Sequence, residues 1–173
     1  MVVLLGFLLW ILFPTGVSAA EPKVTGWIPW FQWEEGVKSA DENIRKLDTV
    51  YLFTYEIDRS GNIINKVDFE REEWEDFFDL AKRRDVELIP TFAWFDGAAI
   101  HETLSDRRSR NDLIERIDDV VDEDNFDGAN IDFEQKRAET IDYFSEFLDD
   151  LERELGADDL TCAIEARMPP EHR

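Results

Sequence analysis

The sequence has few of the residues that would indicate a disulfide-rich or metal-binding protein. Its 173 residues include one cysteine, Cys162, and two histidines, His101 and His172, that have no partners at the spacing of metal ligands. One cysteine cannot form an internal disulfide, so the domain must rely on its core. We expect Cys162 to be a buried, inert thiol in its apolar run and both histidines to lie on the surface.

Positive charge is also scarce. Nineteen Lys and Arg stand against 41 Asp and Glu, which gives a formal net charge of −22. A surface this acidic repels phosphate, so nucleic acid is not expected as a partner, nor is an anionic membrane. Disorder is not expected either, because 43% of the residues are hydrophobic and 13% are aromatic, which is enough apolar surface to build a core.

Charge is absent from residues 1–20, which have the pattern of a secretory signal peptide. Val2–Phe13 form an apolar run that is shorter than the ~20 residues of a transmembrane helix, and the small residues in Gly16–Ala20 fit signal peptidase. We therefore predict a signal peptide over 1–20 and a secreted or cell-envelope location for 21–173, with no stable membrane insertion after cleavage. This n-region lacks Lys and Arg, and the alternative is an uncleaved N-terminal anchor.

The remaining chain alternates short apolar runs with charged stretches of helical periodicity. The runs, each expected to be a buried strand, are Val24–Trp30, Thr49–Ile57, Val86–Phe92, Ala129–Phe133 and Leu160–Ala166. The periodicity is clearest in Ile141–Leu155, which Gly156 ends. This alternation predicts an α/β fold with a parallel sheet, either doubly wound or closed as a (β/α)8 barrel. No glycine motif of a nucleotide site follows any run.

The fourth run carries charge, which buried parallel strands rarely tolerate. Strand alternation puts Asn130, Asp132 and Glu134 on one face, with the two acids roughly 6–7 Å apart. In a barrel, the carboxyl end of a strand is the catalytic end. Two close carboxyls keep their pKa values apart, one protonated and one ionised, which suits glycosidic cleavage. From spacing alone, an exposed loop with solvated acids is equally compatible with the pattern.

The segment Asp127-x-x-Asn130-x-Asp132-x-Glu134 resembles the DxxDxDxE signature of glycoside hydrolase family 18, the chitinase-like family. Asn130 stands where chitinases usually carry Asp, and the flanking residues are more similar to the bacterial branch that cleaves peptidoglycan or spore-cortex glycan. The resemblance implies a TIM barrel that hydrolyses β-1,4 linkages of N-acetylglucosamine-containing polysaccharides by a retaining, substrate-assisted mechanism, with no cofactor and no metal.

The resemblance also implies roles for individual residues. Glu134 would protonate the leaving oxygen and then act as base for water. Asp132 would orient the 2-acetamido group of the substrate, Asn130 would hydrogen-bond to Asp132, and Asp127 would support the strand end.

The length is short for such a barrel, which typically has ~250 residues. We expect 21–173 to be the N-terminal part of the catalytic barrel, with about its first five βα units, and the chain to be a truncated gene product. A natural half barrel that forms a dimer is the alternative.

Aromatic residues near the strand ends are candidates for stacking on sugar rings. The predicted substrate-binding residues are Trp30, Trp33, Tyr55 and Trp94. Trp27 and Trp74 are instead expected in the core, and one of Tyr55 and Glu56 should face the barrel mouth.

Two other functions stay open at this point. A chitinase-like lectin would bind glycan without cleaving it, although such relatives usually lose the last Glu of the signature. An unrelated α/β domain would use its strand-end acids to bind a cation.

Overall fold

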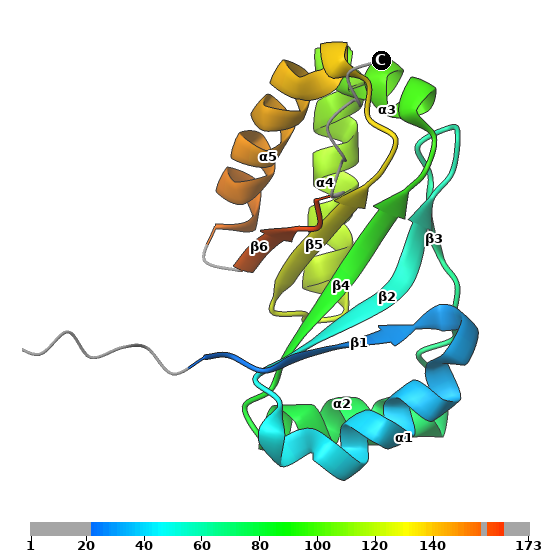
Figure 1. Cartoon of the computed structure of the whole chain (residues 1–173), viewed down its shortest axis with the longest axis vertical. Helices are drawn as coiled ribbons and strands as arrows, with labels where there is room; N and C mark the ends of the chain where they lie inside the picture. Colours follow the sequence, from blue (N-terminus) through cyan, green and yellow to red (C-terminus); the bar gives the residue numbers. More distant parts are fainter. Residues whose placement is uncertain (1–21, 157–158, 165–173) are drawn as a thin grey trace, which may run out of the picture.

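The computed structural model describes residues 22–156 and 159–164, which form a curved sheet with helices against it (Figure 1). The strands are β1 (Thr25–Pro29), β2 (Thr49–Ile57), β3 (Ile63–Asn65), β4 (Glu87–Trp94), β5 (Gly128–Phe133) and β6 (Asp159–Cys162). The helices are α1 (Trp33–Asn43), α2 (Glu72–Arg83), α3 (Gly97–Ser105), α4 (Arg107–Glu123) and α5 (Ile141–Leu155), with 3-10 turns η1 (Trp30–Gln32), η2 (Ile44–Lys46) and η3 (Ala138–Thr140). The five predicted strands are confirmed as β1, β2, β4, β5 and β6; the last of them ends at Cys162, and positions 165 and 166 of its predicted run lie outside the described residues.

The order of the strands identifies the architecture. The sheet runs β1-β2-β4-β5-β6 with parallel neighbours throughout, and the short β3 pairs antiparallel with β2. Each new parallel strand is added on the same side of the last, so right-handed crossovers carry the connecting helices to one face of the sheet. A doubly wound sheet would reverse its order and carry helices on both faces. The described strands and helices are therefore an arc of a (β/α)8 barrel.

The outer face of the sheet is the one that the helices cover, and it holds the core. On β5 the outer residues are Ala129, Ile131 and Phe133, all fully buried. The Phe133 ring stacks on Phe147 of α5 and meets Trp94 of β4 edge-on, at 5.5 Å between centroids in both cases. Burial of each such side chain contributes about 1.5–3 kcal/mol, so this apolar layer is the main stabiliser of the arc.

The inner face of the sheet is the opposite one, and polar residues reach it on every central strand. Its residues include Trp27, Tyr51, Glu56, Thr91, Ala93, Asn130 and Asp132, which the strand registers place on one side. Trp27, predicted to be core, is 46% exposed there, and the centres of the Tyr51 and Phe53 rings lie 5.5 and 5.8 Å from the centre of its own ring. That prediction is wrong, because alternation along β1 turns Ile28, not Trp27, toward the helices.

A bulge in β2 decides which of its last residues faces inward. Leu52 pairs with Pro90, whereas Tyr55, three residues later, pairs with Phe92, only two residues later. The extra residue in β2 changes the alternation, so Tyr55 faces the helices and stacks on Phe92 at 5.3 Å. Glu56 is then the inward residue, opposite Ala93.

The structure adds two elements that the sequence did not predict. The hairpin strand β3 follows a turn in which the Gly61 amide donates to the Asp58 carbonyl at 3.0 Å and Gly61 has a φ of 79°. Helix α3 precedes α4, and Asp106 separates the two because its carboxylate accepts a hydrogen bond from the Ser109 amide at 2.8 Å. Helices α1 and α2 pack together at one end of the arc, and α3, α4 and α5 pack together at the other (Figure 1).

Three minor predictions have mixed outcomes. Trp74 is fully buried as predicted. Cys162 is partly buried, and this burial raises the pKa of its thiol, in agreement with an inert role. His101 is not a free surface residue, because its Nδ1 lies 3.0 Å from the Thr140 hydroxyl; His172 lies outside the described residues. None of the described helices has the length and apolarity needed to span a bilayer.

Candidate active site

Asn130, Asp132 and Glu134 share the inner side of the sheet, as the sequence predicts. Their neighbours along the chain are buried under the helices, whereas Asp132 and Glu134 are partly exposed. The register puts Asn130 opposite Thr91 and Asp132 opposite Ala93 on β4. Because these partners are small, the inner face has room for polar side chains at this level.

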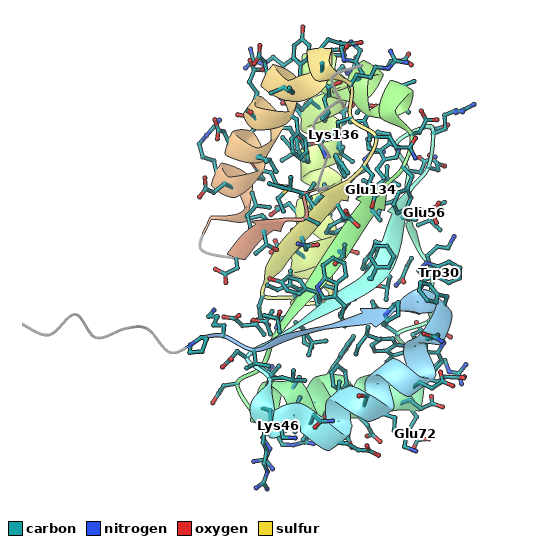
Figure 2. The ribbon with its side chains drawn as sticks, in the orientation of Figure 1. Trp30, Lys46, Glu56, Glu72, Glu134 and Lys136 are labelled. Atoms are coloured by element: carbon teal, nitrogen blue, oxygen red, sulfur yellow. The ribbon has the colours of Figure 1, made fainter. Side chains whose placement is uncertain are left out.

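Glu134 follows the last residue of β5, at the carboxyl end of the strands. Its backbone amide donates to the Trp94 carbonyl at 2.9 Å, which fixes the point where the side chain leaves the sheet. In Figure 2, Trp30, Glu56 and Glu134 follow one another along this end, whereas Lys46 and Glu72 lie beside α1 and α2. We call this end the mouth.

Asn130 is almost fully buried, with 3% of its surface exposed. Its Nδ2 donates to the Thr161 hydroxyl of β6 at 2.8 Å, because Thr161 is its partner in the β5–β6 register. The expected hydrogen bond from Asn130 to Asp132 is not formed, so that prediction is wrong, and Asn130 donates to Thr161 instead. Sequence reasoning missed Thr161, which carries no motif.

Two buried polar atoms at this level have no hydrogen-bond partner among the described residues. They are the Oδ1 atom of Asn130 and the hydroxyl of Thr91, and these two residues pair in register across β5 and β4. Leaving such an atom unpaired costs about 1–3 kcal/mol. Both atoms add polarity to the inner face at the level of Asn130.

A second polar group lies across Ala93 from Asp132. Glu56 pairs in register with Ala93, and Ala93 pairs with Asp132, so both acids face inward at one level. The Lys66 ammonium lies 3.0 Å from the Glu56 carboxylate and 5.1 Å above the centre of the Trp30 ring, which is 39% exposed. Sequence reasoning missed Lys66, which β3 brings back to the mouth.

Lys136 lies beyond the other side of Glu134. Its ammonium donates to the Phe133 carbonyl and lies 4.7 Å above the centre of the Phe144 ring. These two contacts hold the Lys136 side chain at the carboxyl end of β5. Acids and lysines therefore alternate around the mouth.

Asp127, predicted to be part of the catalytic group, lies at the amino end of β5. Its carboxylate accepts from the Leu88 amide at 2.8 Å, and its own amide donates to the Leu88 carbonyl at 3.0 Å. Asp127 supports a strand end, as the resemblance implied. It is the end opposite to the mouth, five residues from Asp132.

The structure places three of the four predicted substrate-binding aromatics away from the inner face. Trp94 is fully buried against Phe133, so its ring has no free face for a sugar. Trp33 begins α1 and stacks on Trp74 at 5.5 Å, with the Arg71 guanidinium 4.7 Å above its ring. Of these four residues, Trp30 alone has an exposed ring at the mouth.

Tyr55 is the third of these residues, and the bulge in β2 turns it outward. Its hydroxyl donates to the Asp124 carboxylate at 3.0 Å, and burial together with this negative charge raises the pKa of its phenol. A buried, neutral tyrosine in the helical layer has a structural role.

The described acids do not form a metal cluster. Within residues 22–156 and 159–164, no three or more His, Cys, Asp or Glu side chains are arranged to hold an ion. What the arrangement offers is a carboxyl pair and an amide on one face, beside an exposed aromatic ring. This set can transfer protons to and from a polar ligand.

Comparisons with known proteins give matches only among solved structures. No protein-family model matches the chain, and no curated protein is similar to it. A class V chitinase from Pseudomonas fluorescens Pf-5 matches with 23% identity and a TM-score of 0.72, over 83% of this chain and 44% of that chain. The spore cortex-lytic enzyme SleL from Bacillus megaterium QM B1551 has 16% identity and a TM-score of 0.68, over 87% and 36%.

A third match is a chitinase from Bacteroides thetaiotaomicron, with 21% identity and a TM-score of 0.63, over 84% of this chain and 47% of that chain. The chain thus spans less than half the length of these three structures. The predicted resemblance is confirmed for the fold: the chain has the barrel fold of chitinases and spore cortex-lytic enzymes of the family 18 type, over part of their length.

Proposed function

We propose that the chain is part of a glycoside hydrolase that cleaves β-1,4 linkages in glycans containing N-acetylglucosamine. One observation carries the proposal: Asn130, Asp132 and Glu134 share the inner face at the carboxyl end of a barrel strand. In barrel enzymes this end holds the catalytic residues. The similarity in fold to chitinases and cortex-lytic enzymes supports a glycan as substrate.

In the proposed reaction, Glu134 is the general acid. Its proton goes to the glycosidic oxygen as the bond to the anomeric carbon breaks, and the acetamido oxygen of the substrate attacks that carbon. Asp132 orients the acetamide and stabilises the positive charge of the cyclic intermediate. Glu134, now ionised, takes a proton from water, which attacks the same carbon and restores its configuration.

The surroundings of the two acids fit these roles. Glu134 is partly exposed, so it is accessible to a ligand. The exposed Trp30 ring offers a flat surface to a pyranose.

The test compares Glu134→Gln with Glu139→Gln, the same change at an exposed glutamate five residues later. Glu134→Gln should lower release of reducing sugar from chitin oligomers or peptidoglycan about 10²–10⁴-fold, because the general acid is lost. Glu139→Gln should leave it unchanged. Activity that survives Glu134→Gln would refute this mechanism.

A binding protein without catalysis is the second candidate, and Asn130 favours it. An amide in place of an acid cannot share a proton with Asp132, which weakens the coupling of charges in the site. This candidate predicts glycan binding by the unmodified chain with no release of sugar. Loss of an observed activity on chelation would instead favour the cation-binding alternative.

We also propose export of the protein, with residues 1–20 as the signal peptide. The proposal is supported by the uncharged, apolar composition of this segment. Sequencing of the N-terminus of exported protein should begin near residue 21. An intact Met1 on membrane-bound protein would favour the anchored alternative.

A further inference from the structure

A hollow at the mouth lies outside the groups described so far. It has a volume of about 440 Å³ and is lined by Arg59, Phe95, Asp96, Gln135 and Arg137, which we call the rim hollow. Its walls are the segments that follow β2, β4 and β5. Three consecutive parallel strands therefore present their carboxyl-end loops to it, which is where barrel enzymes build specificity.

The rim hollow adjoins Glu134. Gln135 is the next residue in the chain, and Arg137 is three residues from Glu134, so their Cα atoms lie at most about 11 Å apart. The Glu134 amide is bonded to the carbonyl of Trp94, the residue before Phe95. A ligand with its cleaved bond at Glu134 has its neighbouring substituents within reach of the hollow.

The walls of the hollow are fixed before any ligand binds. A side chain at Gly97 would place its Cβ 2.0 Å from the Gln135 carbonyl oxygen, so the two loops are in backbone contact. Asp96 accepts from the amides of Ala98 and Ala99 at 3.1 Å and from Arg59 at 2.8 Å. Such preorganisation reduces the entropic cost of binding.

The charge of the hollow is unusual for this protein. It contains two guanidinium groups and one carboxylate, in a chain whose net charge is −22. Asp96 neutralises Arg59. Arg137 is exposed and has no ion pair among the described residues, so one guanidinium remains for an anionic ligand. The 40% exposed Phe95 ring adds an apolar surface beside it.

We infer that the rim hollow is a subsite for a carboxylate carried by the glycan, with Arg137 as its ligand. This inference rests on the proposed function and selects the substrate class. Arginine binds carboxylates through two parallel hydrogen bonds, and a neutral chitin chain offers it no such group. A β-1,4 glycan containing N-acetylmuramic acid carries a lactyl carboxylate next to the scissile linkage. Where a peptide is attached in peptidoglycan, this group is an amide, and the carboxylates of the peptide are free instead.

The experiment measures binding of four probes to the full chain by calorimetry. The probes are the N-acetylglucosaminyl-N-acetylmuramic acid disaccharide, its methyl ester, the disaccharide with a dipeptide on the lactyl group, and chitobiose. The free acid should bind about tenfold more tightly than its ester, as expected for one charge-assisted contact. The dipeptide probe shows whether the lactyl or the peptide carboxylate is the bound group, because its lactyl carboxyl is an amide and its peptide carboxylate is free.

The matched variants are Arg137→Gln and Arg45→Gln, the latter at an exposed arginine in η2. Arg137→Gln should remove the tenfold preference for the acid and leave chitobiose binding within twofold; Arg45→Gln should change neither. Equal binding of acid and ester, or a preference that survives Arg137→Gln, overturns the subsite alone. Failure to bind any of the four probes contradicts the proposed function as well.

Discussion

The two faces of the sheet differ although they are built by the same strands. On the outer face of β4 and β5, large side chains such as Phe92, Trp94 and Phe133 are fully buried. On the inner face, Thr91 and Ala93 of β4 lie opposite Asn130 and Asp132 of β5. Large apolar residues on one face stabilise the arc, and small residues on the other make space for polar groups.

Within a single strand, the residues that stabilise the fold are therefore different from those that could act on a ligand. Asp132 and Phe133 are adjacent in sequence, yet one faces the mouth and the other faces α5. An inner face with an unpaired amide oxygen and an unpaired hydroxyl is locally costly. The outer face must offset that cost, so the substitutions that damage each face should be measurably different.

The largest expected difference is between Phe133→Ala and Asp132→Asn. Phe133→Ala should lower the free energy of unfolding by about 3–5 kcal/mol, because it leaves a cavity against Phe147 and Trp94. Asp132→Asn should lower it by less than about 1 kcal/mol, since the shape is retained at a partly exposed position. Urea unfolding followed by tryptophan fluorescence measures both.

For release of sugar, we expect the opposite order of effects, with the larger loss for Asp132→Asn. Asp132→Asn should reduce sugar release strongly while the protein stays folded. If Phe133→Ala prevents folding, Phe133→Leu keeps most of the volume and should cost less than about 1.5 kcal/mol. Equal losses of stability for the changes at 132 and 133 would show that the faces do not divide the roles.

A smaller effect is expected from adding volume, with Ala129→Val and Ala93→Val. Ala129 is fully buried on the outer face of β5, so two extra carbons there should cost about 1–3 kcal/mol through overpacking. Ala93 lies between Glu56 and Asp132 on the inner face, where the same change crowds the acids. Thermal unfolding and glycan binding measure the two outcomes.

For this pair, Ala129→Val should leave glycan affinity unchanged in the folded fraction. Ala93→Val should weaken the glycan affinity of the folded fraction itself, beyond the decrease in binding that unfolded protein would cause. If Ala129→Val weakens affinity as much, the two faces are coupled and the comparison fails.

The smallest effect concerns two buried threonines of the inner face. The Thr49 hydroxyl donates to the Glu87 carboxylate at 2.6 Å, whereas the Thr91 hydroxyl has no partner. Thr49→Val should lower the free energy of unfolding by about 1–2 kcal/mol, because a charged acceptor loses its donor. Thr91→Val should leave it unchanged or raise it by up to about 1 kcal/mol. A clear loss for Thr91→Val would mean that its hydroxyl is bonded in solution.

The sequence predicts the architecture well because each strand and helix has its own apolar pattern. The five parallel strands follow from the alternation of apolar runs with helical stretches. The shared face of Asn130, Asp132 and Glu134 follows from the alternation of side chains along a strand. Trp94 could not be placed, because every residue from Val86 to Trp94 except Glu87 and Thr91 is apolar and such a run does not reveal its inward side.

The position of Trp33 could have been predicted from its spacing. Trp33 precedes Val37, Ala40 and Ile44 at spacings of four, three and four, so it continues a helical stripe and belongs to the helix packing.

Lys66 and Arg137, in contrast, carry no local sequence pattern. Both reach the mouth through tertiary structure, since β3 folds back on β2 and the loop after β5 meets the loop after β4.

The single extra residue in β2 sets the phase of everything that follows it in that strand. If β2 kept all its residues but ran through Leu52–Glu56 as a regular strand without the bulge, the two sides would be exchanged after Leu52. The phenol of Tyr55 would then point into the mouth, and the charge of Glu56 would be pushed into the hydrocarbon layer beside Phe92. The acidic lining of the mouth thus depends on the bulge as much as on residue identity, and loss of the bulge with every residue kept would be equivalent to exchanging Tyr55 and Glu56.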